Sequence, residues 1–258
     1  MAKKVGKKAA GKKVAKEAAK KAGQSGARVP GLPRIPTGIR RQELLKSVQI
    51  LKYTVSSVNS FYEEFSSSRG GRKGASTHGQ QDQLRAMIVF AAAGLDALLK
   101  QLVKDALRTV CQGPSDELDK FVQRQLRGEE DYLEIDRRFL AGVLLDGSSP
   151  REALLDRFIG ELTSSSLQSK AEVFKIMKSL SIDPVKDLSV NANTLDRVFD
   201  ARNTIIHEMD IDFARAGGQP YPRCIRTRED AVEATVTLLT LGADVLRTLD
   251  VRLGQSQT

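Results

Sequence analysis

The sequence has very few of the side chains that build disulfides and metal sites. Its 258 residues include only two cysteines, Cys111 and Cys224, and only two histidines, His78 and His207. The cysteines have no paired spacing, so neither a disulfide framework nor a zinc site is supported, and a reducing compartment fits best. Two histidines nearly exclude a multi-histidine metal centre within one chain, although a carboxylate site for magnesium would escape this argument. We expect chemistry without a metal or a cofactor.

Long apolar runs are also missing. No uninterrupted run reaches the length of a membrane span, and the basic N-terminus is not followed by the apolar segment of a secretory signal. These absences predict a soluble, cytoplasmic protein with no membrane partner. With 40% hydrophobic residues, the chain can nevertheless build a real core, as one large domain or two small ones.

Positive charge is concentrated at the N-terminus. The first 28 residues hold nine lysines and Arg28 against a single acid, Glu17, which accounts for the whole formal net charge of +9. The rest of the chain is neutral overall, so the net charge gives no argument for a positive groove on the folded part. The lysines are Lys3, Lys4, Lys7, Lys8, Lys12, Lys13, Lys16, Lys20 and Lys21.

The lysines lie in low-complexity Lys/Ala/Gly sequence whose composition resembles the tails of linker histones and of some bacterial nucleoid proteins. Such a segment has almost nothing to bury and should be disordered in isolation. We expect it to bind RNA or DNA through the phosphate backbone without reading bases. A solubilising extension or a membrane-surface contact are the alternatives. "RVPGLPRIPTG" then predicts an extended linker, which gives residues 1–39 as tail and linker and residues 40–258 as the domain.

Apolar residues recur at helical spacing throughout the domain, and no strand pattern competes, so we predict an all-α bundle. Asp96 interrupts the most apolar of these helices. Capping signals are Ser149 with Glu152, Thr227 with Asp230, and Asn193 or Thr194. Region 112–165 contains the least certain elements and is a candidate insertion over the site. The expected helices span residues 40–65, 81–110, 112–128, 149–163, 166–184, 191–209 and 227–249.

One arginine lies in the middle of an apolar helical stripe. In "DARNTIIHEMD", residues 200–210, the apolar residues Leu195, Val198, Phe199, Ile205, Ile206 and Met209 all fall within about 60° of Arg202 on a helical wheel. Asn203 and His207 share the adjacent flank. Burying a guanidinium is expensive, so Arg202 needs either a structural counter-charge or an anionic ligand.

The three polar side chains suit chemistry on a phosphodiester. The imidazole of His207 can take a proton from a ribose 2′-hydroxyl or give one to the leaving 5′-oxygen. The guanidinium of Arg202 can hold the non-bridging oxygens, while Asn203 orients the imidazole or the phosphate. Transesterification works best with a base and an acid on opposite sides of phosphorus. One histidine per chain is too few, and two chains would supply both.

The motif consists of Arg-Asn, three further residues and then His. It lies late in an all-helical domain, before a last long helix, and in these respects the chain resembles the HEPN superfamily. Residues 169–208 look most like its RiboL-PSP type, and the resemblance extends from about residue 81 to about residue 250, leaving out the basic tail. It implies a homodimer with one composite, metal-independent endoribonuclease site, built by Arg202, Asn203 and His207 of each copy. It also implies a toxin of a toxin–antitoxin pair or an effector of antiviral defence. Asp96 matches the acidic residue that often supports the motif arginine.

Other interpretations stay open. Arg202 can instead be a core arginine neutralised by Asp96, with Asn203 and His207 as ordinary polar residues on the helix. Some HEPN members are inactive, so a non-catalytic module that binds nucleic acid or a protein partner is the main alternative. A nucleoid protein, in which the domain only dimerises the tail, is a third. The resemblance also implies an antitoxin or another regulatory partner.

Overall fold

The computed structural model describes residues 26–71, 74–113, 115–127, 139, 141–143, 145, 149–214 and 222–255. Within these ranges every helix or strand is an α-helix, as predicted, apart from one isolated antiparallel bridge between Ile211 and Arg223. The predicted tail lysines at positions 3–21 lie outside the described residues, as does much of region 112–165. The helices are α2 (Gln42–Arg69), α3 (His78–Val110), α4 (Asp116–Arg127), α6 (Pro150–Ser164), α7 (Lys170–Ser179), α8 (Ala192–Glu208) and α9 (Arg228–Gln255).

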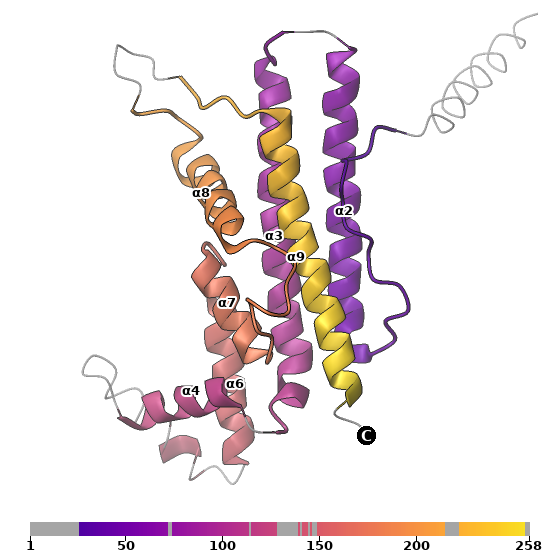
Figure 1. Cartoon of the computed structure of the whole chain (residues 1–258). Helices are drawn as coiled ribbons and strands as arrows, with labels where there is room; N and C mark the ends of the chain where they lie inside the picture. Colours follow the sequence, from indigo (N-terminus) through magenta and orange to yellow (C-terminus); the bar gives the residue numbers. More distant parts are fainter. Residues whose placement is uncertain are drawn as a thin grey trace, which may run out of the picture.

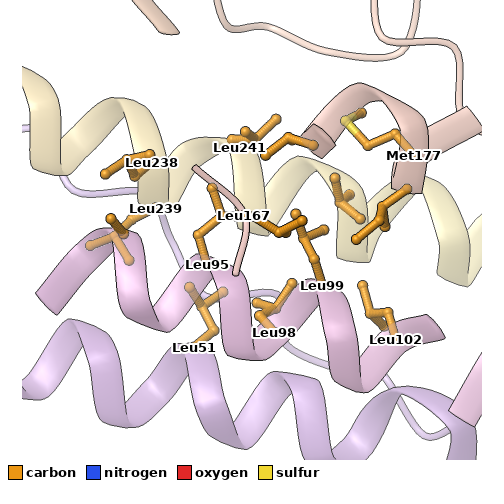
Figure 2. Close-up of a cluster of buried hydrophobic side chains, with 14 of the residues drawn as sticks. Leu51, Leu95, Leu98, Leu99, Leu102, Leu167, Met177, Leu238, Leu239 and Leu241 are labelled. Atoms are coloured by element: carbon orange, nitrogen blue, oxygen red, sulfur yellow. The ribbon is translucent and has the colours of Figure 1, made fainter. Parts of the chain in front are cut away.

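The bundle is organised around α3, the helix that the sequence predicts to be central. Helices α2 and α9 pack along α3, and α6, α7 and α8 line another side of it, with α4 beside α6 (Figure 1). Leucines fill the space where these helices meet. The buried leucines drawn in Figure 2 come from α2, α3 and α9, and they are joined by Leu167 and by Met177 of α7. Burying this much aliphatic surface is the main driving force for the bundle.

Helix α3 also meets a membrane criterion that the sequence analysis did not anticipate. By length and composition alone it could cross a membrane, with a mean hydropathy of 1.7 over its most apolar window. The sequence prediction concerned uninterrupted apolar runs, whereas this criterion averages hydropathy over a window of the helix. Half of that window is buried inside the bundle, and the core helix of a soluble protein passes the same test.

The proline-rich segment before α2 is not helical, as expected of a linker, but it lies against the helices. Val29 is buried, and its backbone N–H donates to Asn59 Oδ1 at 3.0 Å. Leu32, Ile35 and Ile39 pack against the core. The folded part therefore begins before residue 40, because these apolar side chains find a surface that the pattern of prolines does not reveal.

Helix starts follow the predicted signals in some places and differ in others. Thr227 caps α9 as predicted, since its Oγ1 accepts from Asp230 N at 3.0 Å. Ser149 lies at the predicted N-cap of α6, but its side chain makes no capping hydrogen bond. The prediction for α8 is wrong, because Asn191 caps that helix and not Asn193 or Thr194. All of these residue types can cap a helix, so composition alone does not choose among neighbours.

Candidate active site

Helix α8 lies at the edge of the bundle. The motif residues lie where the buried face of this helix meets its exposed face. Leu195, Val198, Phe199 and Ile205 are buried as predicted, but Arg202 is only half-buried. Ile206 is exposed, and the helix ends at Glu208, so Met209 lies outside it. The apolar stripe is therefore shorter than predicted, and Arg202 lies near its open end, where solvent reaches the guanidinium.

Arg202 and Asn203 form one hydrogen-bonded unit on this helix. Arg202 Nη1 donates to Asn203 Oδ1 at 2.8 Å, and Asn203 Nδ2 donates to the carbonyl of Gln168 at 3.0 Å. Arg202 Nη2 donates to Ser166 Oγ at 3.4 Å. Both side chains are thus tied to the connection between α6 and α7. The side-chain amide oxygen of Asn203 and the hydroxyl oxygen of Ser166 orient the guanidinium while leaving its positive charge uncompensated.

Asp96 does not neutralise Arg202. Its Oδ1 accepts from the backbone N–H of Leu167 at 2.8 Å, and its Oδ2 forms an ion pair with Lys100 Nζ at 2.9 Å. No carboxylate within the described residues is ion-paired with Arg202. The expected direct support is therefore wrong, and so is the alternative of a neutralised core arginine. Asp96 instead acts indirectly, because it fixes Leu167 in the connection between α6 and α7, and this connection contacts the motif.

Neighbouring residues of the connection between α6 and α7 contact the core and α8 in turn. Leu167 is buried and takes part in the leucine cluster that Figure 2 shows. Its neighbours Ser166 and Gln168 provide the two oxygens that Arg202 and Asn203 contact. The anchoring of Leu167, by burial and by Asp96, therefore determines where these two oxygens lie.

His207 is exposed, one helical turn after Asn203, in the last turn of α8. The structure does not bring it into hydrogen-bond contact with Arg202 or Asn203 among the described residues. Apolar side chains are exposed nearby in the sequence: Ile206 is 38% exposed, Met209 62% and Phe213 58%. Ile206 and Met209 are called the α8 patch below. One chain thus presents a single accessible imidazole with exposed apolar side chains close to it in the sequence.

A buried carboxylate holds the chain immediately after α8. Met209 and Asp210 both have positive φ, and this sharp turn directs the Asp210 side chain into the bundle. There Asp210 is fully buried and pairs with Arg85 Nε at 2.6 Å and with Arg226 Nη2 at 2.5 Å. Burial by itself raises the pKa of Asp210, but the hydrogen bonds from Arg226 and Arg85 outweigh it and place the pKa below its ordinary value.

The sequence analysis selected Asp96 but did not identify Arg85, Leu167 or Asp210 as supporting residues. Asp210 and Arg85 are 125 positions apart, and Asp96 and Leu167 are 71 apart. A charged residue at a helix end and an arginine near a helix start give no local signal of pairing. The available signal was the presence of single charges, such as Arg85 and Asp96, among apolar residues of α3, since such charges need partners.

Neither cysteine is placed as a nucleophile. Burial raises the pKa of the Cys224 thiol, the charge of Asp210 raises it further, and burial also raises the pKa of Cys111. Both are therefore neutral thiols at pH 7. Within the described part of the chain, histidine, cysteine and carboxylate side chains do not gather in a group of three or more that could hold a metal ion. No protein family, no curated protein and no solved structure matches this chain.

Proposed function

We propose that this all-α chain is a HEPN-like domain that cleaves RNA as a homodimer, without a metal, through Arg202, Asn203 and His207. The observation that carries the proposal is the state of Arg202. Its guanidinium is half-buried and oriented by neutral oxygens, yet no carboxylate in the described residues compensates its charge. A guanidinium in this state is suited to an anionic ligand such as a phosphodiester.

The exposed imidazole supports the same proposal. His207 Nδ1 or Nε2 takes the proton of a ribose 2′-hydroxyl, whose oxygen then attacks phosphorus. The P–O5′ bond breaks, and the leaving oxygen takes a proton from the partner subunit's His207. The products are a 2′,3′-cyclic phosphate and a 5′-hydroxyl. Arg202 stabilises the charge on the non-bridging oxygens as phosphorus is attacked.

The α8 patch supports the pairing of two copies. Ile206 and Met209 are exposed and lie next to His207 in the sequence, so a symmetric contact that covers them would bring two α8 helices together. By resemblance to HEPN proteins, such an enzyme would act as a toxin or as an antiviral-defence effector, with an antitoxin or another regulatory partner.

The test is cleavage of single-stranded RNA by the full chain with a chelator present. The wild type should produce fragments with 2′,3′-cyclic phosphate ends, and His207→Ala should reduce the rate by at least about a hundredfold, the lower range for general acid–base catalysis. Asp200→Ala is the matched control, because Asp200 is also exposed on α8 but lies outside the motif. Equal cleavage by wild type and His207→Ala would assign the activity to a contaminant. Binding without any cleavage would favour the non-catalytic module.

A further inference from the structure

A second feature of the molecule, separate from the motif, is a cavity at the end of the bundle where α2 ends and α3 and α9 begin. It has a volume of about 1430 Å³ and is lined by the C-terminal turns of α2, the first turns of α3 and α9, and the segment before α9. The side chains of Tyr62 and Phe65, both buried, form part of its wall. Its volume exceeds the range of about 300–1,000 Å³ that is usual for small-molecule pockets.

Arginines dominate the polar lining of this cavity. Three of them belong to the charge network around Asp210: Arg85 and Arg226 pair with Asp210, and Arg223 pairs with Asp82. These three are ion-paired, although they share only two carboxylates. The other three, which we call the free-charge set, are Arg28, Arg69 and Arg228. No ion pair joins any of the three to a carboxylate of the described residues.

Two members of the free-charge set are held in place by neutral partners. Arg69 donates to Ser76 Oγ at 3.0 Å and to the carbonyl of Gly74 at 2.8 Å. Arg228 donates to the hydroxyl of Tyr62 and lies over its ring, 5.2 Å from the centroid. These contacts fix the guanidiniums but leave their charges uncompensated. Because a guanidinium has five N–H donors, each still has donors for an anion.

The backbone adds to the positive potential. The N-terminus of α3 lies at the cavity, where His78 lines it, and the first turn of α3 contains no acidic residue. The positive end of that helix dipole is therefore not compensated by its own sequence. Glu229 is the one acidic residue that lines the cavity among the described residues. Although the chain beyond the tail is neutral overall, its charges are arranged so that this end is locally cationic.

We infer that this cavity binds the phosphodiester backbone of a single-stranded nucleic acid, through Arg28, Arg69 and Arg228. Several fixed cations spread over a large opening suit a chain of phosphates better than one phosphate group. In the sequence, Arg28 lies at the end of the lysine-rich segment. The inference concerns binding alone and does not depend on cleavage at α8.

The experiment measures binding of a fluorescent 12-nucleotide single-stranded RNA to the full chain by anisotropy over a series of salt concentrations. All proteins carry His207→Ala, so that the RNA stays intact whether or not the motif is catalytic. The test variant is Arg69→Gln with Arg228→Gln. The matched control is Arg108→Gln with Arg124→Gln, which removes the same charge from α4 and from the opposite end of α3.

The test variant should raise the Kd roughly tenfold and reduce the slope of log K against log salt by about 1.4, the value for two lost phosphate contacts on a single strand. The control should change the Kd less than about twofold, since its charges lie far from the cavity. Equal weakening by the two pairs, or wild-type binding by the test pair, would overturn the inference.

Two further variants test the inference even if the Arg69→Gln, Arg228→Gln variant unfolds. Arg28→Gln alters an exposed side chain before the first helix and should weaken binding about threefold with an unchanged melting temperature. Arg69→Lys with Arg228→Lys keeps the charges and should retain most of the affinity. Inorganic phosphate or a nucleoside monophosphate that displaces the RNA at micromolar concentration would reassign the cavity to a small phosphate ligand and overturn the polymer assignment.

Discussion

At the scale of single residues, the candidate active site depends on residues outside the motif. Arg202 and Asn203 are oriented by Ser166 and Gln168, and these are fixed because Asp96 accepts the N–H of Leu167 between them. Asp96 is thus a positioning residue. Its removal should affect cleavage through the geometry of the connection and not through the charge of Arg202.

Asp96→Ala should lower the free energy of unfolding by about 1–3 kcal/mol, because it leaves the N–H of Leu167 without its acceptor. It should also lower kcat for RNA cleavage while changing KM little. Asp96→Asn keeps an acceptor oxygen and should recover most of kcat. Denaturant unfolding and steady-state kinetics on the two variants check this. If Asn gave no recovery, the ion pair with Lys100 would be the important contact and the positioning role would be refuted.

Asp210 gives a prediction with a defined pH dependence. Its pKa is lowered in the folded state, so folding favours the carboxylate. Its contribution to stability is therefore fully present above the ordinary aspartate pKa of about 3.9 and is lost as the pH falls through the lower folded value. At pH 7 Asp210→Asn should cost roughly 3 kcal/mol, because Arg85 and Arg226 lose their shared counter-charge.

Urea unfolding of the wild type and Asp210→Asn at pH 7 and at pH 3 measures this dependence. The stability difference between the two proteins should be smaller at pH 3, which lies below the ordinary aspartate pKa, because unfolding of the wild type then takes up a proton. The same difference at both pH values would show that the charge of Asp210 does not stabilise the fold.

At the scale of helices, the contact between α2 and α3 depends on a glycine. A Cβ atom added at Gly94 of α3 would lie far inside contact distance of the Thr54 side chain on α2. Gly94→Ala should therefore destabilise the fold by about 1–3 kcal/mol through overpacking. Gly160 on α6 has open space at the same position and is exposed.

Thermal unfolding separates packing from helix propensity. Gly160→Ala should raise the melting temperature, since alanine is favoured in helices by up to about 1 kcal/mol. Thr54→Ala added to Gly94→Ala should recover part of the lost stability. A melting temperature for Gly94→Ala at or above that of the wild type would contradict the close approach of the two helices.

The helices themselves could be predicted from the sequence because their signals are local. The periodic apolar residues of α2, α3 and α9, and the Thr227 cap, lie within a few residues of one another. The limits of α8 were harder: three capping residues compete near its start, and Met209 continues the apolar periodicity although the backbone turns there. Turn geometry at that point depends on the buried pairing of Asp210, which involves Arg85 of α3 and Arg226 before α9.

The motif residues could also be selected from the sequence, but their environment could not. Spacing alone places Asn203 and His207 on one flank of a helix beside Arg202. Whether Arg202 is neutralised depends on the partners of Asp96, and those are decided by the connection between α6 and α7. Similarly, the overall neutrality of the chain after the tail conceals the free-charge set, because net charge contains no information about position.

At the scale of the whole molecule, the two proposed nucleic-acid contacts lie in the same half of the bundle. Figure 1 shows α8 beside the half of α3 in which α3 and α9 begin, and the cavity is at that end. A single strand held in the cavity would then lie in the half of the molecule that carries the motif. The chain provides one imidazole there, so the proposed reaction requires a second copy for its acid.

Cleavage by mixtures of wild-type and His207→Ala chains tests this composite site most directly. The two chains are unfolded and refolded together at a fixed wild-type concentration with increasing His207→Ala, and RNA cleavage is measured with a chelator present. If each site needs the imidazoles of both subunits, the rate per wild-type chain should fall in proportion to the fraction of wild-type chains, because mixed dimers are inactive. A rate per wild-type chain that stays constant would show that each subunit acts alone, and the composite site would be wrong.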